Sequence, residues 1–492
     1  MSQHKYENIK KHEAVPPAGS MIESLRDLGY SPETAAADII DNAIFARAKN
    51  IWIDFKWNGK LSKVSFRDDG KGMNEDELIQ AMRPGSQSPS IKREVNDLGR
   101  FGLGLKTASF SQCRLFTVLS RKKNTPITYW RWDLDYTTDP NTAGWTILNM
   151  ADEEDIELTN NMEEGSIVVW QNLDRIIETN KKEISEDEFY NVAEKVKRHI
   201  EMIFHRYLET GKIKIIFNEI QVNGWDPFLK GEAATQPFPE ELLENGSVKV
   251  KAYVLPHRSK LEEDVWIENE ERGGWDTLQG FYIYRNERLL LAADWLGITR
   301  KKSHYKLARI MIDLPNHLDQ DWQIDIKKSR ARPPLSSRQR LKAIAMATMT
   351  QAEQVFRHRG KQIQRSLSTD FSFVWNEVVK NERYFFRINQ DHPVIAAQIA
   401  KFPEKKKEIQ KLIRIIEETV PGPIIIAKEN EYPDSMVRPF EKTPSEEIVS
   451  LMKELFIGWI KQGFNSDIAK RKLLTTEPFS DYPQLIETLT DE

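Results

Sequence analysis

Asp38 and Asn42 lie four residues apart in the segment AAADIIDNAIFA, which begins at Ala35. On a helix this spacing places a carboxylate and a carboxamide one turn apart on the same side. Oxygen ligands of this kind suit Mg²⁺, which keeps several waters and takes few protein oxygens together with phosphates. The pair therefore predicts a divalent-cation site that faces a phosphorylated ligand.

A second group of candidate residues lies in VSFRDDGKGM, which begins at Val64. The alternation of apolar and polar residues predicts a strand, and Asp68 stands where this alternation gives way to a turn. A carboxylate at a strand end can accept a hydrogen bond from an exocyclic amine. Gly70 and Gly72, just before Met73, let the backbone pass close to a flat ring.

The third segment is DLGRFGLGLKTAS, in which Gly99, Gly102 and Gly104 precede residues that read as the start of a helix. Successive backbone N–H groups at a helix N-terminus form a cradle for phosphate. Alone, such a glycine pattern is more often a packing loop, Asp-Asp-Gly is usually a turn, and Asp and Asn on a helix are usually surface residues. The three segments in this order and spacing together indicate a nucleotide site.

These segments resemble the motifs of the GHKL ATPases, the family of gyrase B subunits, ninety-kilodalton heat-shock chaperones, MutL and MORC proteins. DDGKGM, the run RPGS at 83–86 and the glycine segment are most similar to the MORC and MutL-like bacterial branch. The resemblance implies ATP and Mg²⁺ as ligands and a Bergerat-type ATPase domain.

The roles of individual residues follow from the same resemblance. Asp68 would bind the adenine amino group, Asn42 would hold Mg²⁺, and Lys106 would add positive charge at the phosphates. A fourth motif matches at Gly165, where Ser166 would hold a water near the adenine. The residues expected at the nucleotide are Asn42, Asp68, Gly70, Gly72, Met73, Gly99, Gly102, Leu103, Gly104, Lys106, Thr107 and Ser166.

One position departs from the family pattern. The catalytic glutamate, four residues before the Mg²⁺ asparagine, is Asp38 here. An aspartate can act as the general base, but its carboxylate reaches about one methylene less far. A misplacement of about 1 Å can cost on the order of a hundredfold in rate. The chain is therefore expected to be an ATPase, either slow or with its water held closer to the base.

Local signals predict the elements that must position these residues. Ser31 as N-cap and Pro32 at the first helical position start the helix that carries Asp38. Residues 51–57 and 61–66 alternate in the manner of a half-buried antiparallel pair. Further strands are expected at 115–121, 127–134 and 167–170, followed by a helix over 185–208 that begins with a capping box.

The next segment resembles the second, transducer-type domain of this family. Residues 284–288, YRNER, match the Tyr-x-Asn-x-Arg stretch of MutL and MORC proteins. Residues 212–216 and 220–222 are expected to form a hairpin-like pair, with 248–254 as its third strand. Two more strands are expected at 280–289, running into a turn, and at 310–314.

A basic loop follows at 322–334, WQIDIKKSRARPP. Basic residues this close together usually mark a solvated surface. In the resembled families, however, a lysine on this loop touches the γ-phosphate, which would neutralise charge on the transferring phosphoryl group. Lys327 and Lys328 are therefore candidate catalytic residues. Alternation from Ile324 and Ile326 favours Lys328.

Three other segments carry no site motif. Residues 83–97, rich in Pro, Gly and Ser, predict a mobile loop placed to form a lid over the nucleotide. Residues up to Ala18 read either as a disordered tail or as a strap that crosses to a partner subunit. A charged helix over 404–418 and an amphipathic helix that starts with a capping box at 443–446 predict a small α-rich domain, whose apolar face is either core or partner interface.

We therefore expect an α/β fold that begins with a two-layer α+β sandwich. The GHKL ATPase domain with its N-terminal strap is assigned to residues 1–205. A transducer-like domain of the ribosomal S5 domain 2-like type is assigned to 206–360, and a C-terminal α-rich domain of unknown role to 361–492.

Composition limits the function. The formal net charge of −4 gives no overall attraction to nucleic acid, so any DNA contact must come from local patches. The single cysteine, Cys113, leaves no internal disulfide framework or cysteine-based zinc site and suits a reducing compartment. No apolar run approaches about 20 residues. We therefore expect a cytoplasmic protein without a membrane partner.

The resemblance implies an ATP-gated conformational clamp that acts on DNA within a restriction-like antiviral defence system. A homodimer that closes on ATP binding and an operon-encoded nuclease or helicase are the implied partners. Two alternatives stay open, a chaperone-like ATPase that acts on proteins and an ATP sensor that does not hydrolyse. A sensor histidine kinase is disfavoured, because no membrane span or phosphoacceptor helix precedes the ATP site.

Overall fold

The chain separates into two compact units, Met1–Gln362 and Ile363–Glu492. None of the helices in the described ranges has the length and apolar content needed to cross a bilayer. The computed structural model describes residues 12, 16–85, 104–139, 141, 144–179, 182–318, 321–324, 331–357, 372–380, 383–422, 424–425 and 444–490.

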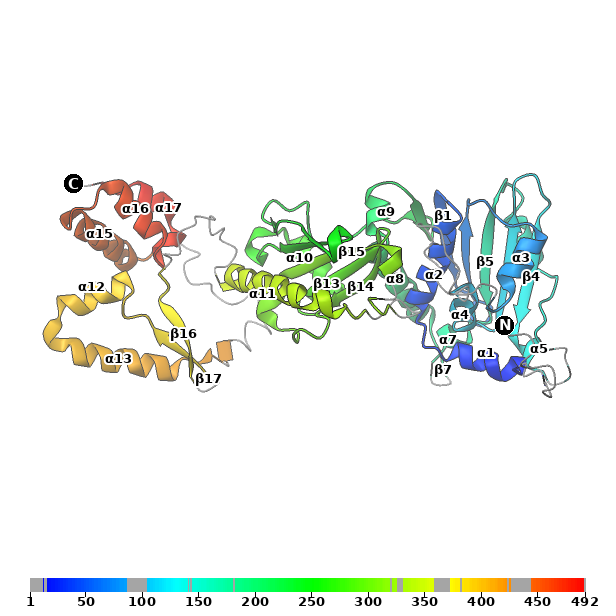
Figure 1. Ribbon diagram of the computed structural model, residues 1–492, viewed down its shortest axis with the longest axis horizontal. Helices are drawn as coiled ribbons and strands as arrows, with labels where there is room; N and C mark the ends of the chain where they lie inside the picture. The colour runs from blue at the N-terminus through cyan, green and yellow to red at the C-terminus, as the bar shows by residue number, and fades with distance from the viewer. Residues whose placement is uncertain are drawn as a thin grey trace, which may run out of the picture. The chain divides into compact units, whose positions relative to one another are not determined.

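A seven-stranded sheet forms the first half of unit 1, in the order β4-β3-β5-β2-β1-β8-β9 (Figure 1). Neighbouring strands are antiparallel except β1 and β8, which are parallel. The strands are β1 (Asn50–Lys56), β2 (Lys63–Asp68), β3 (Leu115–Arg121), β4 (Thr128–Asp133), β5 (Gly165–Gln171), β8 (Lys214–Phe217) and β9 (Ile220–Gln221), with a separate two-stranded ribbon of β6 (Glu178–Thr179) and β7 (Lys182–Glu183).

Helices cover one face of this sheet and complete a two-layer α/β sandwich, as predicted (Figure 1). Apolar side chains of α2, α4 and α8 share one core with those of the strands. The helices of this half are α1 (Ala18–Arg26), α2 (Pro32–Phe45), α3 (Glu75–Met82), α4 (Gly104–Phe110), α5 (Leu134–Thr138), α6 (Glu153–Glu157), α7 (Asp174–Ile177), α8 (Glu186–Ile203) and α9 (His205–Glu209).

A second sheet follows in the order β10-β12-β15-β13-β14, with β11 paired to β12. Its strands are β10 (Gln236–Pro237), β11 (Glu241–Leu243), β12 (Val248–Val254), β13 (Gly280–Arg285), β14 (Arg288–Asp294) and β15 (Ala308–Leu314). The helices around it are α10 (Glu263–Glu271) and α11 (Leu335–Arg357), with short 3-10 turns η2 (Glu244–Gly246), η3 (Arg258–Lys260), η4 (Ser303–Tyr305) and η5 (Asn316–Leu318).

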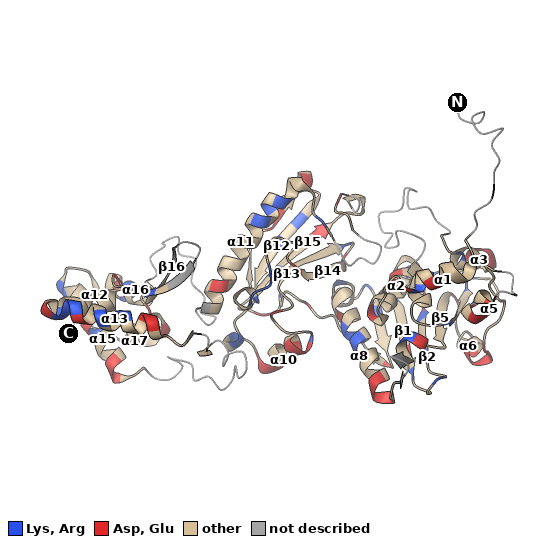
Figure 2. Cartoon of the chain, turned by 90° about the horizontal axis from the view of Figure 1, so that it is seen from below, with Lys and Arg blue, Asp and Glu red and all other residues tan. Residues whose placement is uncertain are grey.

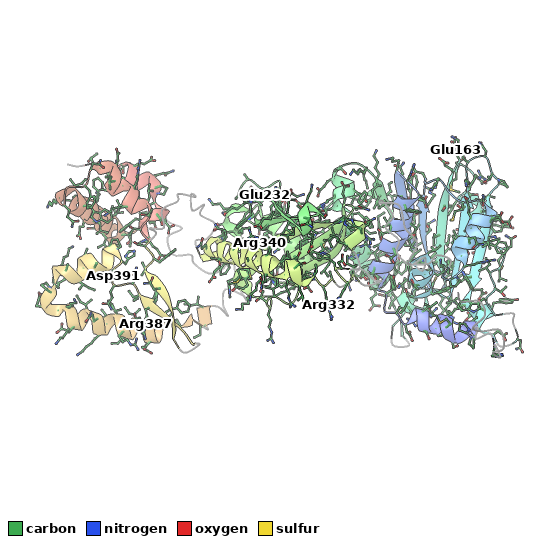
Figure 3. The ribbon with its side chains drawn as sticks, viewed as in Figure 1. Glu163, Glu232, Arg332, Arg340, Arg387 and Asp391 are labelled. Atoms are coloured by element: carbon green, nitrogen blue, oxygen red, sulfur yellow. The ribbon has the colours of Figure 1, made fainter. Side chains whose placement is uncertain are left out.

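Strand β13 of the second sheet is buried on both faces. Phe281 and Ile283 of β13 belong to a core shared with α11, whereas Tyr282 and Tyr284 belong to the core of the first sheet. Because successive side chains of a strand point to opposite faces, β13 lies between the two cores and contributes side chains to both. The first turns of α11 carry several basic residues (Figure 2), and one of them, Arg340, pairs with Glu241 of β11 at 2.6 Å (Figure 3).

One sheet assignment from the sequence is wrong. The hairpin over 212–222 exists as β8 and β9, but 248–254 is not its third strand. Instead β8 pairs with β1 and extends the first sheet to Gln221. Asn218 and Glu219, which form the β8–β9 turn, both have positive φ. Asparagine adopts such a conformation readily, so the sequence itself indicates this turn. Parallel pairing with a strand far back in the chain has no such local signal.

Unit 2 combines one hairpin, β16 (Trp375–Lys380) and β17 (Arg383–Ile388), with several helices. Arg387 of β17 pairs with Glu417 of α13 at 2.6 Å (Figure 3). The N-cap of α15 is Ser445, which has extended backbone angles, so the helix begins two residues after the predicted first position at Pro444. Thr443, the first residue of the predicted capping box, lies outside the described residues. The helices are α12 (Pro393–Lys401), η6 (Pro403–Lys405), α13 (Lys406–Thr419), α15 (Glu446–Lys461), α16 (Ser466–Leu474), η7 (Phe479–Asp481) and α17 (Pro483–Glu487).

Candidate active site

Helix α2 positions the candidate base and the candidate metal ligand. Its start is the predicted one, with Ser31 and Thr34 forming a capping box and Pro32 in the first turn. A run of alanines before Asp38 is fully buried, which lets α2 pack closely against neighbouring elements. The side chain of Asp38 is buried, with 8% of the residue exposed, whereas Asn42 one turn later is exposed. The two side chains thus stand at the edge of the core.

Two groups hold the Asp38 carboxylate from opposite sides. The Tyr30 hydroxyl donates to Oδ2 at 2.9 Å, and Nη2 of Arg288 lies 3.9 Å from Oδ1. Burial and the Asp38 charge raise the pKa of Tyr30 well above its usual value, so this hydroxyl remains a donor. A Cβ atom placed on Gly104 would lie 3.5 Å from Oδ2. The first residue of α4 therefore approaches the carboxylate closely.

Asp68 and Asp69, adjacent at the end of β2, have different environments. Asp68 Oδ1 accepts a hydrogen bond from the Gly70 N–H at 2.8 Å. Burial raises the pKa of Asp68 to about 6, against the lowering effect of backbone hydrogen bonds from Gly70 and Ser166. Asp69 Oδ1 accepts from two backbone N–H groups, including that of Asn50 at 2.8 Å. Asp69 thus fixes the turn, and Asp68 is the candidate ligand.

The glycines of this turn allow close backbone packing. Gly72 has φ +56°, and a Cβ atom there would lie 1.9 Å from the carbonyl oxygen of Arg121. A Cβ atom on Gly70 would lie 2.7 Å from that of Ala46. Because neither position can hold a side chain without movement, the turn requires both glycines for its own packing. Their predicted role beside a flat ring stays a prediction.

Ser166 and Met73 meet through a residue that the sequence did not identify. Ser120 on β3 accepts a hydrogen bond from the Met73 N–H at 2.8 Å and donates to the Gly165 carbonyl at 3.0 Å. Its Oγ also lies 2.8 Å from Oγ of Ser166. Ser120 thus joins the glycine turn to β5, but its place in an ordinary apolar strand gives no sequence signal.

The phosphate segment is described from Gly104 onward. Lys106 is buried, its Nζ donates to the Ala81 carbonyl at 2.8 Å, and burial lowers its pKa to about 8. Thr107 is buried in the same turn of α4. The roles of these residues at the phosphates stay predictions. Outside the described residues lie Gly99, Gly102, Leu103, Lys327, Lys328 and most of the expected lid over 83–97.

Arg288 enters the site from the second sheet. It is the first residue of β14, and its Nε lies 2.9 Å from the carboxylate of Asp41 on α2. Both side chains are buried. The sequence showed Arg288 within the Tyr-x-Asn-x-Arg stretch but assigned it no role. Its partner lies 247 residues away, so no local pattern connects the two.

The comparisons with known proteins agree with this geometry. Residues 30–167 match the family described as "Histidine kinase-, DNA gyrase B-, and HSP90-like ATPase". The protein named "ATPase morc-1" from Caenorhabditis elegans is 28% identical over 116 residues, which are 24% of this chain and 13% of that protein. Residues 30–167 are therefore similar to the GHKL ATPase family, and part of the chain is similar to a MORC ATPase.

The residues of the site fit the ligands that this family implies. Asn42 and Asp38 offer hard oxygen donors of the kind that Mg²⁺ prefers. The turn at Gly70 and Gly72 packs closely against Ala46 and Arg121 and holds the backbone next to the Asp68 carboxylate. Mg²⁺ at Asn42 would neutralise phosphate charge, and Asp68 would accept a hydrogen bond from adenine.

Proposed function

We propose that this protein binds ATP with Mg²⁺ at the site on α2 and hydrolyses it slowly. The observation that supports this proposal most directly is the environment of Asp38. Its buried carboxylate lies one turn from the exposed Asn42 and beside Gly104 at the start of α4. The candidate base thus lies one turn from the candidate metal ligand and beside Gly104, the last glycine of the segment.

In the proposed reaction Asp38 accepts a proton from a water molecule. The water oxygen bonds to the γ-phosphorus while the bond from that phosphorus to the bridging oxygen breaks, which leaves ADP and phosphate. Tyr30 donates to Oδ2 and so fixes the orientation of the carboxylate that takes the proton. Because aspartate is about one methylene shorter than glutamate, we expect slow turnover.

Beyond hydrolysis, we propose an ATP-gated clamp that acts on DNA in a restriction-like antiviral defence system. The resemblance of the site motifs to the MORC and MutL-like branch supports this proposal. The transducer-like domain assigned to 206–360 would move with the nucleotide state and close a homodimer around its substrate. An operon-encoded nuclease or helicase would be its partner, and cleavage would come from a nuclease.

The ATPase rate with and without duplex DNA, at two salt concentrations, tests both levels of the proposal. We expect slow hydrolysis that DNA stimulates, with stimulation that falls as salt rises because phosphate contacts release counterions. Asp38→Ala should retain ATP and Mg²⁺ but lose turnover, whereas Asn42→Ala should lose Mg²⁺-dependent binding. Asp38→Glu should hydrolyse faster if the short side chain limits the rate.

The two alternatives give different results in the same assay. A chaperone-like ATPase would hydrolyse ATP without any salt-dependent effect of DNA. An ATP sensor would bind the nucleotide with Asp68 and Asn42 but show no turnover above the Asp38→Ala variant. Hydrolysis by Asp38→Ala at the parent rate would mean that another group is the base.

A further inference from the structure

Arg288 uses each of its three side-chain nitrogens. Nε lies 2.9 Å from the Asp41 carboxylate, Nη1 donates to the Leu289 carbonyl at 3.0 Å, and Nη2 lies 3.9 Å from Oδ1 of Asp38. Only 5% of the side chain is exposed. A guanidinium held by hydrogen bonds at Nε and Nη1 has a fixed orientation, and here that orientation places Nη2 within ion-pair distance of the proposed base.

The backbone of Arg288 is also fixed. It follows the β13–β14 turn, where the Tyr207 hydroxyl donates to the Asn286 carbonyl at 2.6 Å. Glu287 in the same turn pairs with Lys212 at 2.6 Å, but both side chains are partly exposed, so this ion pair contributes little to fixing the turn. β13 is a central strand of the second sheet, between β14 and β15. A shift of the second sheet relative to α2 would therefore have to change the contacts of Arg288.

The Asp38 carboxylate is held between this arginine and Tyr30, which donates to the other oxygen at 2.9 Å. A short side chain such as aspartate has few orientations, and a small misplacement of a base costs much of its rate. We infer that Arg288 is a positioning residue for Asp38, through which the second sheet sets the rate of ATP hydrolysis. The inference rests on the proposed function.

Kinetics of Arg288→Ala, Arg288→Lys and Asp41→Asn test this inference. Arg288→Ala should lower kcat at least about tenfold, since it leaves the base unheld. KM and the Kd of a fluorescent ATP analogue should stay within about threefold, because no ground-state contact to the nucleotide is removed. Arg288→Lys should restore part of kcat, and Asp41→Asn should lower kcat in the same way without changing nucleotide affinity.

Glu287→Gln is the matched control, because it breaks the Lys212 ion pair in the same turn without touching α2. It should keep the parent kcat. The inference is overturned if Arg288→Ala keeps the parent kcat, if Glu287→Gln loses as much, or if both Arg288 variants lose nucleotide binding as unstable proteins would. A parent chain without any ATPase activity would overturn the proposed function and the inference with it, whereas an active parent with a fully active Arg288→Ala would overturn the inference alone.

Discussion

At the scale of single residues, Asp68 combines a ligand role with an unusual environment. Burial raises its pKa to about 6, because the carboxylate has lost water while the backbone hydrogen bonds from Gly70 and Ser166 compensate only in part. An adenine amino group would supply a further donor to the ionised form. Nucleotide binding should therefore lower the pKa of Asp68 again.

Asp68→Asn should weaken ATP binding by about 1.5–3 kcal/mol, because it replaces a charged acceptor with a neutral one. In the parent, ionisation of Asp68 on binding should release a proton at pH 5.5–6, and affinity should fall as the pH drops through about 6. At pH 8 the carboxylate is already ionised, so no proton should be released. Isothermal titration in buffers of different ionisation enthalpy measures both quantities.

The Asp68→Asn variant also serves as the control for the pH dependence, because its side chain at position 68 does not titrate. Asp68→Asn should bind ATP with an affinity that no longer changes near pH 6. Equal affinity of the parent and the variant at pH 8 would remove the adenine assignment of Asp68 and with it much of the argument for a nucleotide site.

Residues of this site differ in how far the sequence could reveal them. Asp38 and Asn42 were found because helical spacing places them together, and Asp68 because it ends an alternating strand. Ser120 and Arg288 could not be identified from the sequence, since their roles come from tertiary contacts alone. Ser120 is one small polar residue in an apolar strand, and Asp41, the partner of Arg288, lies on α2, 247 residues away.

At the scale of elements, the turn after β2 depends on a glycine with positive φ. Gly72→Ala should destabilise the fold by roughly 1–3 kcal/mol from backbone strain alone. The added Cβ atom would lie 1.9 Å from the Arg121 carbonyl oxygen, so the turn must also move away from β3. Because Met73 is held to the same strand, we expect the variant to lose ATP affinity as well as thermal stability.

Gly59→Ala provides a matched comparison. Gly59 has nearly the same φ, +55°, but an added Cβ atom would meet no heavy atom within 4 Å. Gly59→Ala should therefore lose only the stability that backbone strain costs and should keep full ATP affinity. Thermal melts and nucleotide titrations of the two variants would contradict the assignment of this turn if Gly72→Ala lost no more than Gly59→Ala.

Strand limits were predictable where a strand alternates and ends at turn residues. β3 and β12 have the expected bounds of 115–121 and 248–254. The helix expected over 185–208 instead ends at Ile203 and resumes as α9 at His205. There His205 hydrogen-bonds to Tyr284 of the second sheet, at 2.7 Å. Here the helix breaks at a tertiary contact with the second sheet, which the apolar stripe of the helix could not show.

At the scale of the whole molecule, the α/β class followed from the sequence because the motifs and the strand patterns agree with one another. The pairing of β8 with β1 did not, since it joins segments far apart in the chain. The domain limits of 205 and 360 stay predictions. In the structure, strand β13 lies between the two cores of unit 1 and contributes aromatic side chains to both. Any movement of the second sheet relative to the first that nucleotide binding drives would therefore have to change the packing of β13 and the contacts of Arg288.

The proposed clamp predicts that ATP, but not ADP, closes a dimer. Shifting a two-state equilibrium from mostly open to mostly closed needs about 5.5 kcal/mol of differential binding. A lysine on the γ-phosphate together with several backbone N–H groups of the glycine segment can supply energy of this size through charge-assisted hydrogen bonds. Lys328→Ala, or Lys327→Ala if that residue reaches the nucleotide, should therefore bind ATP but fail to dimerise.

Light scattering with a non-hydrolysable ATP analogue decides this prediction, because it separates closure from turnover. The parent should double in mass with the analogue and remain a monomer with ADP. Lys342→Ala, which removes an exposed charge from α11, should behave like the parent. A parent protein that stays monomeric with the analogue would exclude the clamp, whatever its ATPase rate. In that case the contacts to the γ-phosphate would not bring two subunits together, so they could not transmit the nucleotide state to a second subunit.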